Sequence, residues 1–205
     1  MRQDQVDELE RIRTELEGHM GRVDLRRYRH SLGVASCAAE LARAYGVDVF
    51  DAAAAGLLHD WDKVVPDAEL LARAATYRVP VAGPPTLAVG LLHGPVAAAE
   101  LPERFEGLGP QVFQAIARHT LGAPDMTPLD MAVFVADAIE PGRRGDYAER
   151  LRALVGQASL TELFFQTFSQ GLVYVLSTGR YLYPTAVGIY NTYALRDRAG
   201  DRPER

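Results

Sequence analysis

Apolar residues recur at intervals of three and four along most of this chain, which is the pattern of amphipathic helices. Thirty of its 205 residues are alanine, the residue with the highest helix propensity. No run of alternating β-branched residues, as expected for a half-buried strand, competes with this pattern. The sequence therefore predicts an all-α protein. The length fits one domain, with a core over about residues 22–192 and a polar, frayed tail from about 197.

Capping residues, glycines and prolines indicate where these helices begin and end. Asp48, Thr127 and Ser159 each precede an apolar helical stretch and are good N-caps. Gly46 can stop the helix that precedes Asp48. The proline-rich stretch 79–85 is the clearest loop. The expected helices cover residues 25–45, 48–59, 66–77, 86–100, 110–119, 128–139 and 160–176, after an opening amphipathic helix that ends at Gly18 or Gly21.

Charge and cysteine content limit the functional class and the compartment. The net charge of -5 argues against broad electrostatic attraction to nucleic acid or to an anionic membrane surface. The single Cys37 excludes an intrachain disulfide, fits a reducing compartment and lies in an apolar helical stretch typical of the core. The start of the chain lacks the apolar segment of a secretory signal, and no window is apolar enough to span a membrane. We therefore expect a cytoplasmic protein.

Four of the five histidines lie in apolar, helical surroundings, whereas His19 lies in a predicted turn and is given no role. One histidine in such surroundings is more often a core or surface residue than a ligand. Two carboxylates change this balance: one follows His59 directly, and another lies in the apolar run AVFVADAIE, where an unpaired charge would be costly. The residues concerned are His30, His59, Asp60, His93, His119 and Asp137.

A metal ion bound between helices would partner all of these groups at once. Nitrogen and oxygen donors without a thiolate suit iron, manganese, zinc or another first-row ion better than a structural zinc cage. An ion in such a site can generate a nucleophile at neutral pH and neutralise phosphoryl oxygens. The pattern therefore predicts a metal site built by side chains from several helices.

The ordered motifs RYRHSLGVA, GLLHDWDK, LLHGPVAA, IARHTLG and FVADAIEPGR resemble those of the HD-domain metal phosphohydrolases. They are most similar to the bacterial YqeK type, known as symmetrical diadenosine-tetraphosphate hydrolases. The likeness runs from about Arg26 to Asn191. It implies an HD-type helical bundle that hydrolyses diadenosine tetraphosphate to two ADP by attack of metal-bound water, and it also implies a homodimer.

The resemblance also implies roles for individual residues. Asp60 and Lys63 would be catalytic, and one or two iron ions would be bound. The metal ligands would be His30, His59, Asp60 and Asp137. His93 and His119 would hold a second ion or contact the substrate phosphate. Further phosphate contacts would come from Arg27, Lys63, Thr120 and Arg143, and nucleotide contacts from Leu182, Tyr183, Pro184, Thr185 and Ala186.

Two positions differ from the family pattern. Asp62 stands where a small residue is usual, and Pro184-Thr185-Ala186 replaces the usual Pro, any residue, Thr. The second difference bears on nucleoside contacts more than on metal chemistry.

Lys63 stands out because 21 of the 22 basic residues are arginine. It follows Asp60 by three residues, so a helical turn can bring its ammonium group to a phosphate near the metal. Arg27 and Arg143 can bind phosphate oxygens in bidentate fashion, although single arginines are as often solvated surface residues. Among the aromatic residues, Phe164, Phe165 and Phe168 at helical spacing indicate core packing. Tyr181, Tyr183, Tyr190 and Tyr193 can pack or stack on a purine.

Two alternatives remain open from the sequence. An HD phosphohydrolase acting on a mononucleotide or a cyclic nucleotide would use the same ligands with a different pocket. A non-catalytic nucleotide-sensing module commonly loses the metal ligands, whereas all six are present here.

Overall fold

The computed structural model describes residues 1–200, with side chains to residue 195, and contains helices but no strand within that part of the chain. The all-α prediction is confirmed. The α-helices are α1 (Gln3–Leu16), α2 (Leu25–Tyr45), α3 (Val49–Leu58), α4 (Asp67–Thr76), α5 (Pro85–Ala88), α6 (His93–Glu100), α7 (Pro110–Arg118), α8 (Pro128–Ile139), α9 (Asp146–Leu154), α10 (Leu160–Ser177) and α11 (Ala186–Gly200).

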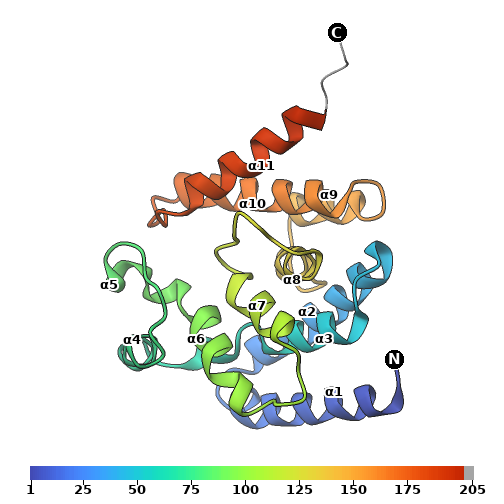
Figure 1. Ribbon diagram of the computed structural model, residues 1–205, viewed down its shortest axis with the longest axis vertical. Coiled ribbons are helices and arrows are strands. Elements are labelled where there is room, and N and C mark those ends of the chain that lie inside the picture. The colour runs from blue at the N-terminus through green and yellow to red at the C-terminus, as the bar shows by residue number, and fades with distance from the viewer. Residues whose placement is uncertain (201–205) are drawn as a thin grey trace.

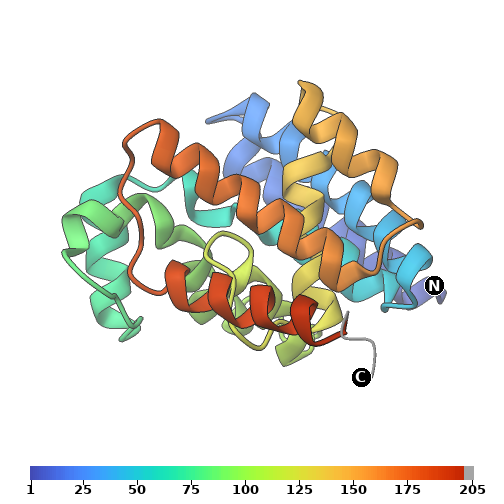
Figure 2. The same cartoon turned by 90° about the horizontal axis from the view of Figure 1, so that it is seen from above.

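Helix α8 lies in the middle of the bundle. Figure 1 shows α1 along one side, α9, α10 and α11 along the opposite side, and α8 between these layers. The view from above in Figure 2 shows α11 running beside α10. Helix α8 packs against α2, α3, α7 and α10. Its side chains can therefore meet residues from most of the bundle.

Helices α2 and α3 pack closely because Gly56 faces the backbone of α2. A Cβ atom at Gly56 would lie 2.7 Å from the Cα atom of Ala35. A larger residue here would push the two helices apart. This approach places His30 of α2 near the end of α3, where His59 lies.

The predicted helix caps are confirmed by backbone hydrogen bonds. The side chain of Asp48 accepts from the N–H of Asp51 at the start of α3. Thr127 accepts from the N–H of Asp130, whose carboxylate accepts from the N–H of Thr127, so α8 begins with a full capping box. Ser159 caps α10 through the N–H of Glu162.

The helix expected over residues 86–100 is wrong as a single element. It is divided into α5, the 3-10 turn η3 (Val89–Leu91) and α6. The carbonyl oxygen of Gly90 accepts hydrogen bonds from Lys63 Nζ at 3.3 Å and from His93 Nδ1 at 3.1 Å. These tertiary contacts, together with the low helix propensity of glycine, favour the break.

Two helices are absent from the sequence prediction. Helix α9 follows the Pro141-Gly142 stop, and α11 follows α10, so α10 is not the last helix. In α11 the side chains of Ile189 and Tyr193 are buried four residues apart, and this packing outweighs the poor helix propensity of Gly188. The tail expected from residue 197 continues this helix to Gly200, and residues 201–205 lie outside the described part of the chain.

The main core is formed by apolar side chains of α1, α2, α3, α7, α8 and α10. Cys37 is a buried free thiol in this core, as predicted. Phe164 and Phe168 are also buried there, while Phe165 packs against its edge. No helix in the described part of the chain has the length and apolar character needed to cross a membrane.

Candidate active site

His59 and His119 are positioned in the same way, each at the C-cap of a helix. Nδ1 of His59 lies 2.8 Å from the carbonyl of Gly56, and Nδ1 of His119 lies 2.7 Å from the carbonyl of Ile116. Each Nδ1 therefore carries the proton and donates to a carbonyl three residues earlier. This fixes the tautomer in both rings and leaves each Nε2 unprotonated, with Nε2 of His59 unpartnered and Nε2 of His119 2.9 Å from Oγ1 of Thr120.

His30 connects α2 to α8 and to the turn that follows it. Nε2 of His30 is 2.9 Å from Oδ1 of Asp137, and Nδ1 is 3.1 Å from Oε1 of Glu140. Glu140 is buried, and its carboxylate also accepts from the backbone N–H of Gly142. A Cβ atom at Gly33 would lie 2.6 Å from Oε2 of Glu140, so glycine at this position makes room for the carboxylate.

Asp60 lies where the other groups converge, at the N-cap of the 3-10 turn η2 (Trp61–Val64). Its Oδ1 is 3.1 Å from Nε2 of His93 and 3.7 Å from Nε2 of His119. Its Oδ2 is 3.8 Å from Nε2 of His59 and 3.5 Å from Nη1 of Arg27. One oxygen of the Asp60 carboxylate therefore faces His93 and His119, and the other faces His59.

The donor set fits a metal ion. Nε2 of His59 is fully buried and has no hydrogen-bond partner, although buried polar atoms are normally paired. Three groups have ligand atoms within 4.8 Å of one another: His30 with His59 and Asp60, His59 with His119 and Asp137, and Asp60 with His93 and His119. The six predicted ligands are thus brought together from five helices and a turn, and an ion would partner the orphaned nitrogen of His59.

Burial and neighbouring charges favour, in four members of the cluster, the protonation states that metal ligands need. Burial lowers the pKa values of His59 and His93 to about 4, so both rings are neutral near pH 7. Burial acts to raise the pKa values of Asp60 and Asp137, but neighbouring histidines outweigh it and hold both well below the usual range. Neutral imidazoles and ionised carboxylates are the forms that bind metal.

Three cationic side chains border this cluster. Lys63 of η2 places Nζ 3.1 Å from Nδ1 of His93, and burial lowers its pKa. Arg27, in the first turn of α2, contacts Asp60 as described above. Arg143 places Nη2 2.6 Å from Oδ1 of Asp137 and donates from Nε to the Asp137 carbonyl. These cations come from three separate segments, and all border the same cleft.

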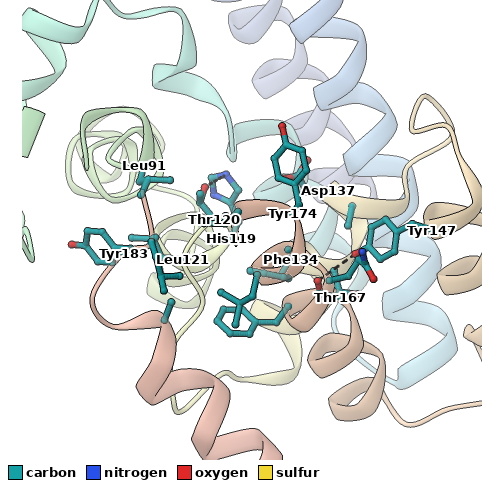
Figure 3. Close-up of a pocket in the computed structure, with 18 of the residues that line it drawn as sticks. Leu91, His119, Thr120, Leu121, Phe134, Asp137, Tyr147, Thr167, Tyr174 and Tyr183 are labelled. Atoms are coloured by element: carbon teal, nitrogen blue, oxygen red, sulfur yellow. Dashed lines mark hydrogen bonds between the residues drawn. The ribbon is translucent and has the colours of Figure 1, made fainter. Parts of the chain in front are cut away.

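Two unlike cavities meet at the cluster. The first, here called the arginine cleft, has a volume of about 1010 Å³ and is lined by Arg26, Arg27, Arg29, Lys63 and polar cluster residues. The second, here called the aromatic cavity, has a volume of about 770 Å³. Figure 3 shows its wall, where His119 and Asp137 lie with the rings of Phe134, Tyr147 and Tyr174. Both cavities are lined by His119, Thr120, Asp137 and Arg143.

The segment 182–186 only partly lines these cavities. Leu182, Tyr183 and Ala186 line the aromatic cavity, whereas Pro184 and Thr185 are exposed and do not. The hydroxyl of Tyr183 accepts from the backbone N–H of Ala82 at 2.8 Å, which ties this segment to the proline-rich loop.

The remaining aromatic candidates divide between cavity and core. Tyr181 also lines the aromatic cavity. Tyr193 is buried and its hydroxyl accepts from the N–H of Met126, so it packs in the interior. Tyr190 is exposed and lies against Phe165.

Sequence reasoning missed several residues of this site. The sequence did contain a signal for Glu140, because this residue lies one helical turn after the candidate ligand Asp137. Arg26 and Arg29 lie on the same helix as His30 but cannot be told from other surface arginines by sequence. Phe134, Tyr147 and Tyr174 come from three different helices, and only the packing of α8, α9 and α10 brings them together.

Comparisons with known proteins agree with this architecture. The family model of the HD domain matches residues 27–142. A Staphylococcus aureus protein named "Bis(5'-nucleosyl)-tetraphosphatase, symmetrical" is 30% identical over 84% of this chain and 89% of its own length. A Bacillus subtilis protein of the same name is 32% identical over 80% of this chain and 88% of its own length.

A solved structure is also similar. It is described as a predicted HD superfamily hydrolase involved in NAD metabolism from Clostridium acetobutylicum, and it aligns with a TM-score of 0.83 and 28% identity over 91% of this chain and 97% of that chain. The matched family segment covers more than half of the chain and contains the whole histidine and aspartate cluster. The chain therefore belongs to the HD domain family, in the group that includes these bacterial relatives.

Proposed function

We propose that this protein is a metal-dependent symmetrical bis(5'-nucleosyl)-tetraphosphatase, which hydrolyses diadenosine tetraphosphate to two ADP. One observation carries the proposal: a cluster of metal-binding side chains lies at the junction of a cationic cleft and an aromatic cavity. Hydrolysis of a phosphoanhydride bond in a nucleotide needs a metal ion at the reacting bond, cations for the phosphates and aromatic rings for the base. The names of the bacterial relatives support the same reaction.

The residues divide into those that hold the ion and those that hold the substrate. His30, His59, Asp60 and Asp137 would bind one ion, and His93 and His119 would bind a second ion with Asp60 or contact a phosphate. A first-row divalent ion supplies a nucleophile at neutral pH and neutralises charge on the attacked phosphoryl group. Iron as that ion and a homodimer follow from the resemblance, a cytoplasmic location follows from the sequence composition and the absence of a secretory segment, and all three remain predictions.

The cations act on the phosphate chain. Lys63 Nζ lies beside the cluster and supplies one compact positive charge to a phosphate oxygen. Arg27 and Arg143 present planar guanidinium groups that bind two phosphate oxygens at once. Arg27 contacts Asp60, and Arg143 contacts Asp137. Thr120 Oγ1, 3.2 Å from Nε2 of His93, is a further donor at the same place.

Product analysis tests the proposal directly. The purified protein is assayed for bound metal and incubated with diadenosine tetraphosphate, a mononucleotide and a cyclic nucleotide, and the products are separated by anion exchange. ADP as the only product from the dinucleotide, lost in Asp60→Ala, is expected. ATP together with AMP would show that cleavage is asymmetric. Turnover of the mononucleotide or cyclic nucleotide alone would favour another HD phosphohydrolase activity, and no turnover with metal bound would favour a sensing module.

A further inference from the structure

The two cavities that meet at the metal cluster differ in what they can recognise. Both contain His119 and Asp137, so one phosphate chain can pass from one cavity to the other across the cluster. A dinucleotide cleaved at its centre must place one half on each side of the reacting atoms. The chemistry of each cavity therefore determines how each half is held.

The aromatic cavity is suited to a nucleoside. Rings of Phe134, Tyr147, Tyr174, Tyr181 and Tyr183 line it, and aromatic rings of this kind stack on bases. Its volume of about 770 Å³ falls within the usual range of small-molecule sites, about 300–1,000 Å³. The shared metal-cluster residues lie on its wall, so a nucleoside bound here directs its phosphates to the cluster.

The arginine cleft offers positive charge in place of the phenylalanine and tyrosine rings that line the aromatic cavity. Within the described part of the chain its lining includes no phenylalanine, tyrosine or tryptophan, and its apolar members are Leu25 and Pro141, both exposed. Arg26 and Arg29 are exposed on α2 and extend the cationic surface away from the cluster. This cleft can neutralise a phosphate chain, but it has little to hold a second base.

We propose that the enzyme requires only one nucleoside and also hydrolyses nucleoside 5'-tetraphosphates, releasing a nucleoside diphosphate and pyrophosphate. This inference rests on the proposed function and adds a second class of substrate. Water adds across the bridge between the second and third phosphates from the nucleoside. One P–O bond forms to the water oxygen, the P–O bond to the bridging oxygen breaks, and the protons of water pass to the products or to solvent. No further reactant is needed.

Parallel assays of the metal-loaded protein with adenosine 5'-tetraphosphate and diadenosine tetraphosphate test this inference. We expect ADP and pyrophosphate from the first substrate, with kcat/KM within about tenfold of the second, because the missing nucleoside makes few contacts. Cleavage of diadenosine tetraphosphate to ADP without cleavage of adenosine tetraphosphate, or with release of ATP and phosphate from it, would overturn the inference and leave the proposed function intact. No turnover of either substrate would overturn both.

A cleft variant provides a second, independent readout. The double substitution Arg26→Gln with Arg29→Gln should lower kcat/KM for both substrates by the same factor, since both place the same phosphates in the cleft. If the variant impairs only the dinucleotide, the cleft recognises the second nucleoside and the inference fails. Arg43→Gln is the matched control, because Arg43 is exposed on the same helix but outside both cavities.

Discussion

The carboxylate of Glu140 lies 3.1 Å from Nδ1 of His30, across 110 residues of sequence. Nε2 of the same ring faces Asp137 in the metal cluster. A buried carboxylate behind a histidine ligand fixes the orientation of the ring and increases its basicity. Glu140 is thus a positioning residue for the metal site rather than one of its ligands.

We therefore expect substitution of Glu140 to weaken metal binding. Glu140→Ala should lower metal affinity about 10–100-fold, and Glu140→Gln should lower it less, because the amide oxygen still accepts a hydrogen bond. Competition with a chromogenic chelator measures the affinity without relying on activity. Glu149→Gln, on the exposed face of α9, is the control. Unchanged affinity in Glu140→Ala would show that His30 is positioned by its other contacts.

Metal removal should reduce stability as well as activity, because it leaves Nε2 of His59 buried without a partner. An ion present at 100 times its dissociation constant contributes about 2.7 kcal/mol to the free energy of unfolding. In a protein of this size that corresponds to a decrease of roughly 5–10 °C in Tm on chelation. Thermal denaturation with and without chelator measures it, and re-added ion should restore both Tm and hydrolysis.

A variant assigns this effect to the cluster. His59→Ala should show little difference in Tm between chelated and metal-supplemented samples, whereas His19→Gln should respond like the unmodified protein. His19 is half-buried, stacks on Trp61 and lies outside the groups that can bind an ion. An equal response in His59→Ala would place the stabilising ion elsewhere.

Lys63 should act on substrate rather than on the metal. Lys63→Met retains an unbranched side chain of nearly the same length but removes the ammonium group that lies beside His93. We expect kcat/KM for diadenosine tetraphosphate to fall about 10²-fold, the usual effect of removing one group that stabilises charge in the transition state. Metal content measured on the same sample should be unchanged. Loss of the metal in Lys63→Met would contradict this division of roles.

The helix caps could be predicted from sequence, but the break within the helix expected over residues 86–100 could not. Caps such as Asp48 and Thr127 act within one helical turn, so their short-range pattern predicts the hydrogen bonds that form. The break at Gly90 depends on Lys63, which is 27 residues away in sequence. Such a contact adds to the low helix propensity of glycine, but it leaves no local signal of its own.

The candidate site shows the same division. The six potential ligands were identified because each lies in a distinctive motif and the order of the motifs resembles a known family. The rings of the aromatic cavity belong to helices of ordinary composition, and Tyr174 is an exposed residue like many others. Only the folded arrangement shows that Phe134, Tyr147 and Tyr174 share one cavity with Asp137.

Asp62, which departs from the family pattern, lies on the side of η2 where Arg73 binds several carboxylates. It is fully buried, and its Oδ1 lies 3.3 Å from Nη1 of Arg73, while its Oδ2 has no hydrogen-bond partner. Arg73 also binds Glu69 and Glu100, so one guanidinium group serves three carboxylates. Burial, followed by the negative charge of Glu100, raises the pKa of Asp62 to about 7.

This raised pKa makes stability depend on pH. In the unfolded chain an aspartate titrates near pH 4, so between about pH 4 and pH 7 the folded state binds more protons than the unfolded state. The contribution of Asp62 to stability is therefore fully present below pH 4 and is lost as the pH rises through 7. Asp62→Asn cannot ionise, so the free energy of unfolding of this variant should rise relative to the unmodified protein as the pH increases.

Urea denaturation of both metal-free proteins at several values between pH 5 and pH 8 measures this difference. We expect it to change in favour of Asp62→Asn by at least about 1.4 kcal/mol across the range, the equivalent of one pKa unit. Asp67→Asn, exposed in the first turn of α4, controls for the general effect of removing a carboxylate. A difference that stays constant from pH 5 to pH 8 would mean that Asp62 is already ionised at pH 5, with Arg73 compensating its burial.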